Sequence, residues 1–513
     1  MTDAAALPTA SPGAANLRRV AIDPLSRVEG HGKVTLLLDE HRRVRQARLH
    51  IVEFRGFEAF VCGRPYWEVP VMVQRLCGIC PVSHHLAASK AIDAALGIRV
   101  VPPAAEAQRR LMHYGQILQS HALHFFHLAS PDLLFGFDSD VGRRHVLAVA
   151  TEYPEVARQG VLLRKFGQEI IRATAGKRVH GTGSVPGGVN RALPRDERDA
   201  LAAELPQVLA WCEQAVDLVQ RLHEADPALY DGFGAVPAAL FSLLGDRGAL
   251  ELYDGRITVR DAAGQVTVAA HDPAHYLDLV DEAVRPWSYM KFPYLRTLGA
   301  DDGWYRVGPL ARVQNCEFIA TPRAEARRQA FRARGGVGGL GGGLQHGALA
   351  THWARMIEML HAAEVIGQLL ADDAVLGSEL TTSPPAHRPG EGVGIIEAPR
   401  GTLIHHYRIG GDDLVTWCNL IVSTTHNNQA MHETVRAVAD RYFDGREVTE
   451  ALLNHIEVAI RAFDPCLSCA THAVGSMPLQ VQVVDAEGAV VSGLQRDGAG
   501  GLSRSSVPAP LKP

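Results

Sequence analysis

The sequence has few cysteines and no long hydrophobic run, and both shortages narrow the possible functions. Only 8 of its 513 residues are cysteine, a frequency typical of proteins in a reducing compartment rather than of disulfide-rich secreted ones. No stretch of about 18 apolar residues is present, so the sequence predicts no transmembrane helix. We therefore expect a cytoplasmic protein.

The sequence also lacks an excess of basic charge. Its 51 Lys and Arg residues and 56 Asp and Glu residues give a formal net charge of −5, with a pI near 6.6. This balance argues against nucleic acid or an anionic membrane as the main partner. The hydrophobic content of 47% allows a sizeable core. At this length we expect either one large composite domain or two closely packed domains.

The N-terminal segment shows no clear targeting signal. Small and polar residues dominate the start of the chain, and we expect a disordered leader over residues 1–16. Arg18 and Arg19 could begin a twin-arginine signal, but Asp23 and Glu29 stand where the apolar segment of such a signal should be.

Hydrophobic periodicity predicts a helix-rich core, a helical bundle, decorated by small antiparallel sheets, which is an α+β fold. Strand patterns predict one hairpin at 33–39 and 44–53, a second at 256–269, and a strand-rich stretch at 392–424. Apolar residues recur at helical spacing in six segments: 66–96, 104–129, 153–176, 196–226, 347–372 and 428–462.

A glycine-rich run at 335–343 contains a formal match to the dinucleotide-binding pattern G-x-G-x-x-G. It follows a helical stretch rather than a strand, so it predicts a flexible loop and not a nucleotide site. A nicotinamide site, if the function requires one, is expected on another chain.

Four of the cysteines form two Cys-x-x-Cys pairs. Cys77 and Cys80 make the first pair, Cys466 and Cys469 the second. This spacing can point two sulfurs at one place, so the pairs could make a four-thiolate metal site if the fold joins them. Soft thiolates select zinc, iron–sulfur units, nickel or copper.

The cysteine pattern alone leaves four interpretations open. They are a structural zinc site, a thiol redox motif, unrelated buried cysteines and a catalytic transition-metal site. Zinc pairs are usually much closer in sequence, and neither pair has a visible thioredoxin-like setting.

The residues around the pairs resemble the paired signatures of nickel–iron hydrogenase large subunits. The likeness covers about residues 18–490, and is greatest to the soluble NAD-reducing type, although viologen-reducing and deazaflavin-reducing types share much of it. The matching stretches are RVEGH (27–31), VEFRGFE (52–58), RLCGICPVSHH (75–85), WSYMKFPYL (287–295), YRVGPLARV (305–313), EAPRG (397–401) and DPCLSCATH (464–472).

This resemblance implies an enzyme that reversibly splits dihydrogen heterolytically at a Ni–Fe centre. Cys80 and Cys469 would bridge the two metals, Cys77 and Cys466 would bind nickel terminally, and the iron would carry carbon monoxide and cyanide. The chain has no ferredoxin-like cysteine run. The electrons are therefore expected to pass to an iron–sulfur small subunit, then on to NAD through a flavin-bearing diaphorase.

Three further residues match functional positions of the family. Glu29 resembles the first proton-relay carboxylate, with a surface ion pair to Arg27 as the alternative. His84, one helical turn after Cys80, would donate to that sulfur, or would simply lie on a helix face. Arg400 resembles the arginine that overhangs the iron ligands, although Pro-Arg-Gly could also be a turn.

The resemblance also implies weaker matches. Ser423 and Thr424 align with residues that hydrogen-bond a cyanide. Glu58, His472 and the Leu420 carbonyl align with ligands of a separate magnesium or iron site.

One position departs from the family pattern. Many relatives have an aspartate where this chain has Ser120, so a carboxylate near the active site is missing and its role is open. We expect the neighbouring His121 to be structural.

Relatives are made as precursors, which implies nickel chaperones and a maturation endopeptidase that cuts after His472 once nickel is inserted. We therefore expect a hydrogenase domain over 17–472 and a removable segment over 473–513. The alternative is a permanent terminal hairpin.

Two other functions compete with that of a hydrogenase enzyme. A non-catalytic, quinone-linked relative of this fold lacks the cysteine pairs, which this chain retains. A dihydrogen sensor that signals through a kinase would have nearly the same residues, and its copurifying partner would distinguish it.

Overall fold

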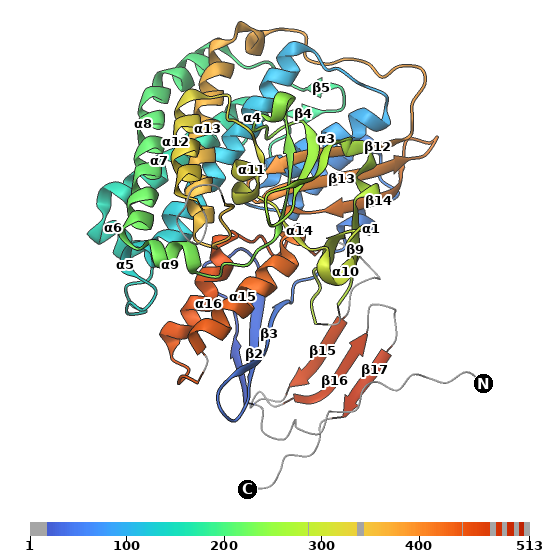
Figure 1. Cartoon of the computed structure of the whole chain (residues 1–513). Helices are drawn as coiled ribbons and strands as arrows, with labels where there is room; N and C mark the ends of the chain where they lie inside the picture. Colours follow the sequence, from blue (N-terminus) through green and yellow to red (C-terminus); the bar gives the residue numbers. More distant parts are fainter. Residues whose placement is uncertain are drawn as a thin grey trace, which may run out of the picture.

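The computed structural model describes residues 18–285, 287–335, 343–443 and 445–471, and the strands 479–484, 490–496 and 502–506. Long helices stand together in one half of the molecule, and small sheets lie in the other half (Figure 1). No helix among these residues is both long and apolar enough to cross a membrane.

The helical half is built on five long helices whose apolar faces form the largest core cluster. They are α4 (Pro103–Leu123), α7 (Pro154–Ala175), α8 (Arg195–Ala225), α12 (Pro322–Arg334) and α13 (Ala350–Ala371). Helices α4 and α7 cross closely because each has a glycine at the contact. A Cβ added to Gly167 would lie 2.6 Å from the carbonyl oxygen of Gly115.

The other α-helices lie outside this group of five, and α3 among them starts at the first cysteine pair. They are α1 (Phe57–Val61), α2 (Val69–Met72), α3 (Pro81–Ala95), α5 (Ser130–Phe135), α6 (Val146–Glu152), α9 (Pro227–Gly232), α10 (Gly299–Asp302), α11 (Pro309–Asn315), α14 (Ser423–His426), α15 (Asn428–Phe443) and α16 (Glu450–Ala462).

The sheets before residue 472 are small, and all but one of their strand pairs are antiparallel. They comprise β1 (Arg18–Ile22), β2 (Gly32–Leu38) and β3 (Val44–Ile51); β4 (Ser184–Val185) and β5 (Gly188–Val189); β6 (Ala239–Leu244), β7 (Arg256–Arg260), β8 (Val266–His271) and β11 (Tyr305–Arg306); β9 (Val280–Ala283) and β10 (Phe292–Leu295); and β12 (Glu391–Ala398), β13 (Gly401–Ile409) and β14 (Val415–Ile421).

Helix α3 lies directly on strand β12, and two glycines allow this contact. A Cβ on Gly394 would lie 2.2 Å from the Ala87 carbonyl oxygen, and one on Gly392 would lie 2.1 Å from that of Ala91. The close packing fixes α3 on the sheet that carries Arg400 and His405.

The α+β fold with a helix-rich core is confirmed, as are the two hairpins and the strands within 392–424. The stretches 66–96 and 428–462, where apolar residues recur at helical spacing, are helical in part, and each is interrupted. Helix α3 begins only at Pro81, after short 3-10 and α turns and the Cys77–Cys80 loop. Near the end of 104–129, α4 gives way to a π-helix at His124–Ala129.

Two regions with sequence-based predictions fall largely outside the described residues. The expected leader at 1–16 is one, and the glycine-rich loop is the other, apart from Gly335 and Gly343. Beyond residue 472 the backbone forms a separate three-stranded antiparallel sheet (Figure 1) of β15 (Leu479–Val484), β16 (Val490–Arg496) and β17 (Leu502–Ser506).

Candidate metal centre

The first cysteine pair occupies the turn that starts α3. Cys77 follows a 3-10 turn at Val73–Leu76, and Cys80 is the N-cap of α3. The backbone N–H groups of Ile79 and Cys80 donate to the Cys77 sulfur at 3.3 and 3.0 Å. These donors favour a thiolate at Cys77.

The second pair follows α16 in a loop held against the N-terminal part of the chain. The Leu467 N–H donates to the Glu29 carbonyl at 3.0 Å, and Glu29 and Cys466 form a parallel β-bridge. The Cys466 N–H donates to Thr424 Oγ1 at 3.0 Å. These contacts fix the second pair against Glu29 and α14, and the Cys469 thiol donates to the Leu76 carbonyl, next to Cys77, at 3.3 Å.

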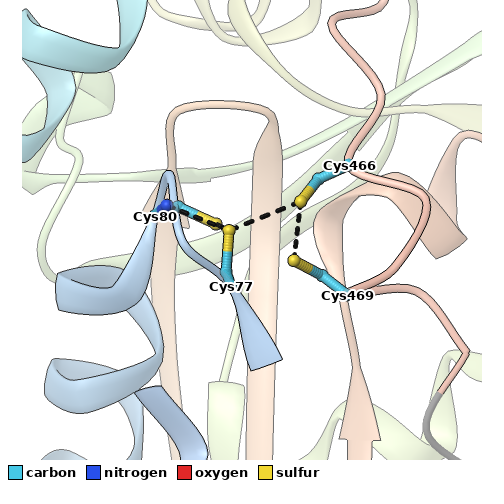
Figure 2. A group of neighbouring side chains, drawn as sticks. All are labelled: Cys77, Cys80, Cys466 and Cys469. Atoms are coloured by element: carbon cyan, nitrogen blue, oxygen red, sulfur yellow. Dashed lines mark hydrogen bonds between the residues drawn. The ribbon is translucent and has the colours of Figure 1, made fainter. Parts of the chain in front are cut away.

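All four sulfurs converge on one buried point, as Figure 2 shows. The Sγ–Sγ distances are 2.9 Å for Cys77–Cys80, 3.4 Å for Cys77–Cys466 and 2.6 Å for Cys466–Cys469. Every pair lies within 4.8 Å, so the four sulfurs are close enough together to share a metal site. The hypothesis of unrelated buried cysteines is therefore wrong.

The electrostatics of the cluster depend on its burial. Burial and the neighbouring sulfurs raise the pKa of the Cys466 thiol well above its ordinary value. For Cys77, burial also acts to raise the pKa, but hydrogen bonds from the other sulfurs and the charge of Arg400 lower it well below that value. Four thiolates can coexist here only with added positive charge, which a bound metal supplies.

Glu29 contacts the second cysteine pair directly. The Cys466 thiol donates to Glu29 Oε2 at 2.9 Å, and the Ser468 N–H donates to the same oxygen at 3.2 Å. The Ser468 hydroxyl also bonds Glu29 Oε1. The alternative ion pair with Arg27 is not formed, because Arg27 binds Asp132 at 2.6 Å.

Arg400 is buried at the turn between β12 and β13, beside the cluster. Its Nε donates to the Asp464 carbonyl at 2.6 Å and its Nη2 to Asp464 Oδ1 at 3.0 Å. Burial alone would lower its pKa, but Asp464 and the nearby cysteine sulfurs raise it well above its ordinary value. Ser120 Oγ lies 3.5 Å from Nη1, so the guanidinium contacts both this hydroxyl and the Asp464 carboxylate.

A small cavity opens beside Cys80 and Cys466. Its volume is about 10 Å³, and its walls are formed by Cys80, His84, Ala398, Pro399, Arg400, Leu403, Val422, Ser423, Thr424 and Cys466. The Ser423 hydroxyl donates to the Gly401 carbonyl at 2.7 Å, whereas Thr424 Oγ1 holds the Cys466 N–H. Donation from either hydroxyl to a cyanide stays a prediction.

His84 lies on α3 and faces β13. Its Nδ1 is 3.1 Å from His405 Nε2, a neighbour that the sequence did not indicate. The predicted hydrogen bond from His84 to the Cys80 sulfur stays a prediction, but both side chains line the same cavity.

The residues expected at a second metal site lie together in part. The Leu420 N–H donates to Glu58 Oε1 at 2.9 Å, so α1 and β14 place these two residues in contact. His472, the third expected ligand, lies outside the described residues.

His121 is buried in a charged cluster away from the sulfurs. Its Nε2 is 3.1 Å from Glu358 Oε2, and Arg312 bridges Glu358 and Glu397 at 2.6 and 3.0 Å. These contacts support the structural interpretation of His121. Sequence patterns did not reveal this charged cluster. They also did not reveal the contact between Asp464 and Arg400, although the place of Asp464 in the motif DPCLSC could have indicated it.

Comparison with known proteins identifies the family. A nickel-dependent hydrogenase model matches residues 55–135 and 257–472, and a HoxL-like model matches residues 19–54. The chain belongs to the nickel-dependent hydrogenase family, as the catalytic large subunit of a nickel–iron hydrogenase.

Within this family the chain is similar to the NAD-reducing type. It is 46% identical over 487 residues to the beta subunit of the NAD-reducing hydrogenase HoxS of Cupriavidus necator, covering 92% of this chain and 99% of that relative. An F420-non-reducing hydrogenase chain of Methanothermobacter thermautotrophicus is 39% identical over 480 residues, with coverage of 92% and 99%.

Solved structures agree with this grouping. A crystal structure of NAD+-reducing NiFe-hydrogenase in the H2-reduced state matches with a TM-score of 0.86 and 59% identity, covering 89% of this chain and 99% of that one. The Ni-Fe-Se hydrogenase of D. vulgaris Hildenborough, at 24% identity and a TM-score of 0.71 over 89% of this chain and 100% of that one, shares the fold.

The residues present fit a Ni–Fe centre. Four buried sulfurs meet at one point, a buried guanidinium balances part of their charge, and a cavity lies against one sulfur of each pair. The surrounding walls are mostly apolar, with Arg400, Ser423 and Thr424 as the polar exceptions beside His84.

Proposed function

We propose that this chain reversibly oxidises dihydrogen, and that the electrons pass through an iron–sulfur small subunit, then through a flavin diaphorase, to NAD. The convergence of the four buried sulfurs carries this proposal. The likeness to an NAD-reducing hydrogenase chain supports NAD as the electron acceptor.

Within the centre, Cys80 and Cys469 would bridge the metals, and Cys77 and Cys466 would bind nickel. When bound, the nickel–iron pair with its carbon monoxide and cyanide ligands supplies an electron-rich site at which dihydrogen is polarised and split. Arg400 holds a fixed positive charge at the cavity. Ser423 and Thr424 supply polar side chains to the cavity wall.

Glu29 is the proton acceptor in this proposal. Its Oε2 lies 2.9 Å from the Cys466 sulfur, which is within reach for direct proton transfer. The other carboxylate oxygen, Oε1, accepts a hydrogen bond from the Ser468 hydroxyl, which holds the carboxylate in this orientation. Glu58, Leu420 and His472 would hold a separate magnesium or iron ion.

The iron–sulfur partner would dock beside the cysteine loops. Exposed apolar side chains gather in the segment that connects β3 to the Cys77 loop, namely Val52, Phe54, Phe60 and Trp67. The Val52 N–H bonds the His31 carbonyl, and Arg55 Nη1 donates to the Leu76 carbonyl at 3.3 Å. This segment therefore lies next to both Glu29 and Cys77, where electrons must leave.

The docking face can be tested by copurification. Phe54→Glu should reduce recovery of the small subunit, because it places a charge in an apolar contact. Val161→Glu, at another exposed apolar position, on α7, is the matched control and should leave recovery unchanged. Equal recovery with both variants would rule out this face.

Maturation is proposed to remove residues 473–513. The family match ends at His472, and the solved NAD+-reducing structure aligns with 89% of this chain but 99% of its own. Intact mass should fall by the mass of residues 473–513 when nickel is supplied to the producing cells. An active, nickel-loaded chain of full mass would contradict cleavage and favour the permanent hairpin.

The function itself is tested with the complex purified from a host able to mature it. Dihydrogen should reduce both NAD and a viologen dye. Cys466→Ser should abolish both activities and nickel retention, whereas Cys316→Ser, a buried cysteine outside the cluster, should keep them. Dye reduction without NAD reduction would contradict NAD as the acceptor but not the hydrogenase activity. Retention of both activities in Cys466→Ser would contradict the four-cysteine metal site.

A further inference from the structure

Three buried side chains form a hydrogen-bonded row that ends at the metal cavity. His84 Nδ1 lies 3.1 Å from His405 Nε2, and His405 Nδ1 lies 2.6 Å from the Tyr407 hydroxyl. His405 and Tyr407 are two residues apart on β13 and therefore share a face of the strand. His84 lines the cavity together with Cys80.

The position of the Tyr407 hydroxyl gives the row a direction. Among the described residues, the hydrogen-bond partner of this hydroxyl is His405 Nδ1. If His405 donated to Tyr407, the tyrosine O–H would be left without an acceptor in the core, which is unfavourable. Burial also raises the pKa of Tyr407 well above its ordinary value, so the hydroxyl keeps its proton and donates it.

This direction determines the tautomers of both histidines. Burial disfavours a charged imidazolium, and a neutral imidazole has one N–H. His405 accepts at Nδ1, so its hydrogen is on Nε2 and is donated to His84 Nδ1. The hydrogen of His84 must then be on Nε2, at the ring edge opposite His405.

We propose that Tyr407 is a positioning residue that acts through His405 to keep His84 a hydrogen-bond donor beside the Cys80 sulfur. The inference rests on the proposed function, because the donor acts on a sulfur that would bridge the metals. A hydrogen bond to a metal-bound thiolate withdraws electron density from the metals. Tyr407 would thus adjust the electron density of the centre without touching it.

The infrared spectrum of the matured complex tests this inference with a readout other than activity. In Tyr407→Phe, His405 loses its donor and can reverse its tautomer, so His84 can turn an acceptor toward the cavity. The carbon monoxide and cyanide bands should remain but move to lower wavenumber, because the iron becomes more electron-rich.

Tyr276→Phe is the matched control. The Tyr276 hydroxyl lies 3.2 Å from His406 Nδ1, but His406 is on the opposite face of β13 from His405. This variant also loses a buried tyrosine hydroxyl beside a histidine, and its bands should not move.

A second pair of variants covers the case in which Tyr407→Phe fails to assemble. In His405→Gln the amide oxygen can accept from Tyr407 and the amide nitrogen can donate to His84, so its bands should lie nearer the wild type than those of His405→Leu. Unshifted bands in Tyr407→Phe, or identical spectra for the two His405 variants, would overturn the inference. Absence of these bands from the wild type would instead refute the proposed Ni–Fe centre, and the inference with it.

Discussion

Glu29 connects a sequence motif to the proton-transfer role that we propose for its carboxylate. Its backbone pairs with that of Cys466, and this pairing keeps its carboxylate in contact with the Cys466 sulfur. The motif RVEGH indicated Glu29 as a candidate. Its contact with Cys466 could be found only from the fold, because 437 residues separate the two.

Glu29→Gln should lower dihydrogen oxidation by about 10²–10⁴-fold, because a carboxamide cannot accept the proton. The infrared bands of the centre should persist, which separates loss of proton transfer from loss of the metals. Glu53→Gln is the control, since Glu53 is a carboxylate that bonds His31, two residues after Glu29, at 2.5 Å. Full activity in Glu29→Gln would assign the proton to another group.

Arg400 shows how geometry and charge can be tested separately. Its planar guanidinium contacts both the carbonyl and the carboxylate of Asp464 while facing the cavity. Arg400→Lys retains the charge but cannot reproduce this fork. We expect activity to fall by about 10²–10³-fold at unchanged nickel content, measured by metal analysis and dye reduction. Unchanged turnover would show that charge alone suffices.

At the scale of secondary structure, the contact between α3 and β12 positions half of the metal site. Cys80 caps α3, His84 lies one turn further, and β12 leads into Arg400. This contact depends on glycines, because a Cβ on Gly394 would lie 2.5 Å from the Ala91 nitrogen.

Gly394→Ala should therefore push α3 away from the sheet. The overpacking should destabilise the protein by about 1–3 kcal/mol and reduce nickel retention, as measured by thermal unfolding and metal analysis. Gly411→Ala is the control, because a Cβ there meets nothing within 4 Å. Equal stability and equal nickel in both variants would contradict the role of the close contact.

The sequence predicted most elements and singled out the four cysteines whose sulfurs converge, because periodicity and local motifs specify them. Over 66–96 the helical spacing did not show that Pro70, Gly78 and Pro81 divide the stretch into short turns, a loop and α3. The sequence also missed the Tyr407–His405–His84 row. His84 and His405 are 321 residues apart, and no local pattern reports such a contact.

At the scale of the whole molecule, a buried charge cluster joins the two halves. Arg312 of α11 binds Glu358 of α13 and Glu397 of β12, and Glu358 also contacts His121 of α4. Burial alone would raise the pKa of Glu358, but Arg312 and His121 lower it from 4.5 to about 2. The pair therefore contributes stability above pH 4.5 that is lost as the pH falls toward 2.

Glu358→Gln should lower the free energy of unfolding by about 3 kcal/mol near neutral pH. The difference from the wild type should shrink below about pH 4.5, because the wild type loses the same contribution on protonation. Urea unfolding at several pH values measures this. Glu155→Gln, at an exposed position on α7, should change stability by less than about 0.5 kcal/mol. A pH-independent difference for Glu358→Gln would contradict the assignment.

The central claim is that the four converging sulfurs hold a nickel–iron centre. The most direct measurement is an infrared spectrum of the complex purified from a maturing host, with and without dihydrogen. We predict bands of metal-bound carbon monoxide and cyanide that shift under dihydrogen. A chain lacking residues 473–513 that shows no such bands and contains only zinc would contradict the claim.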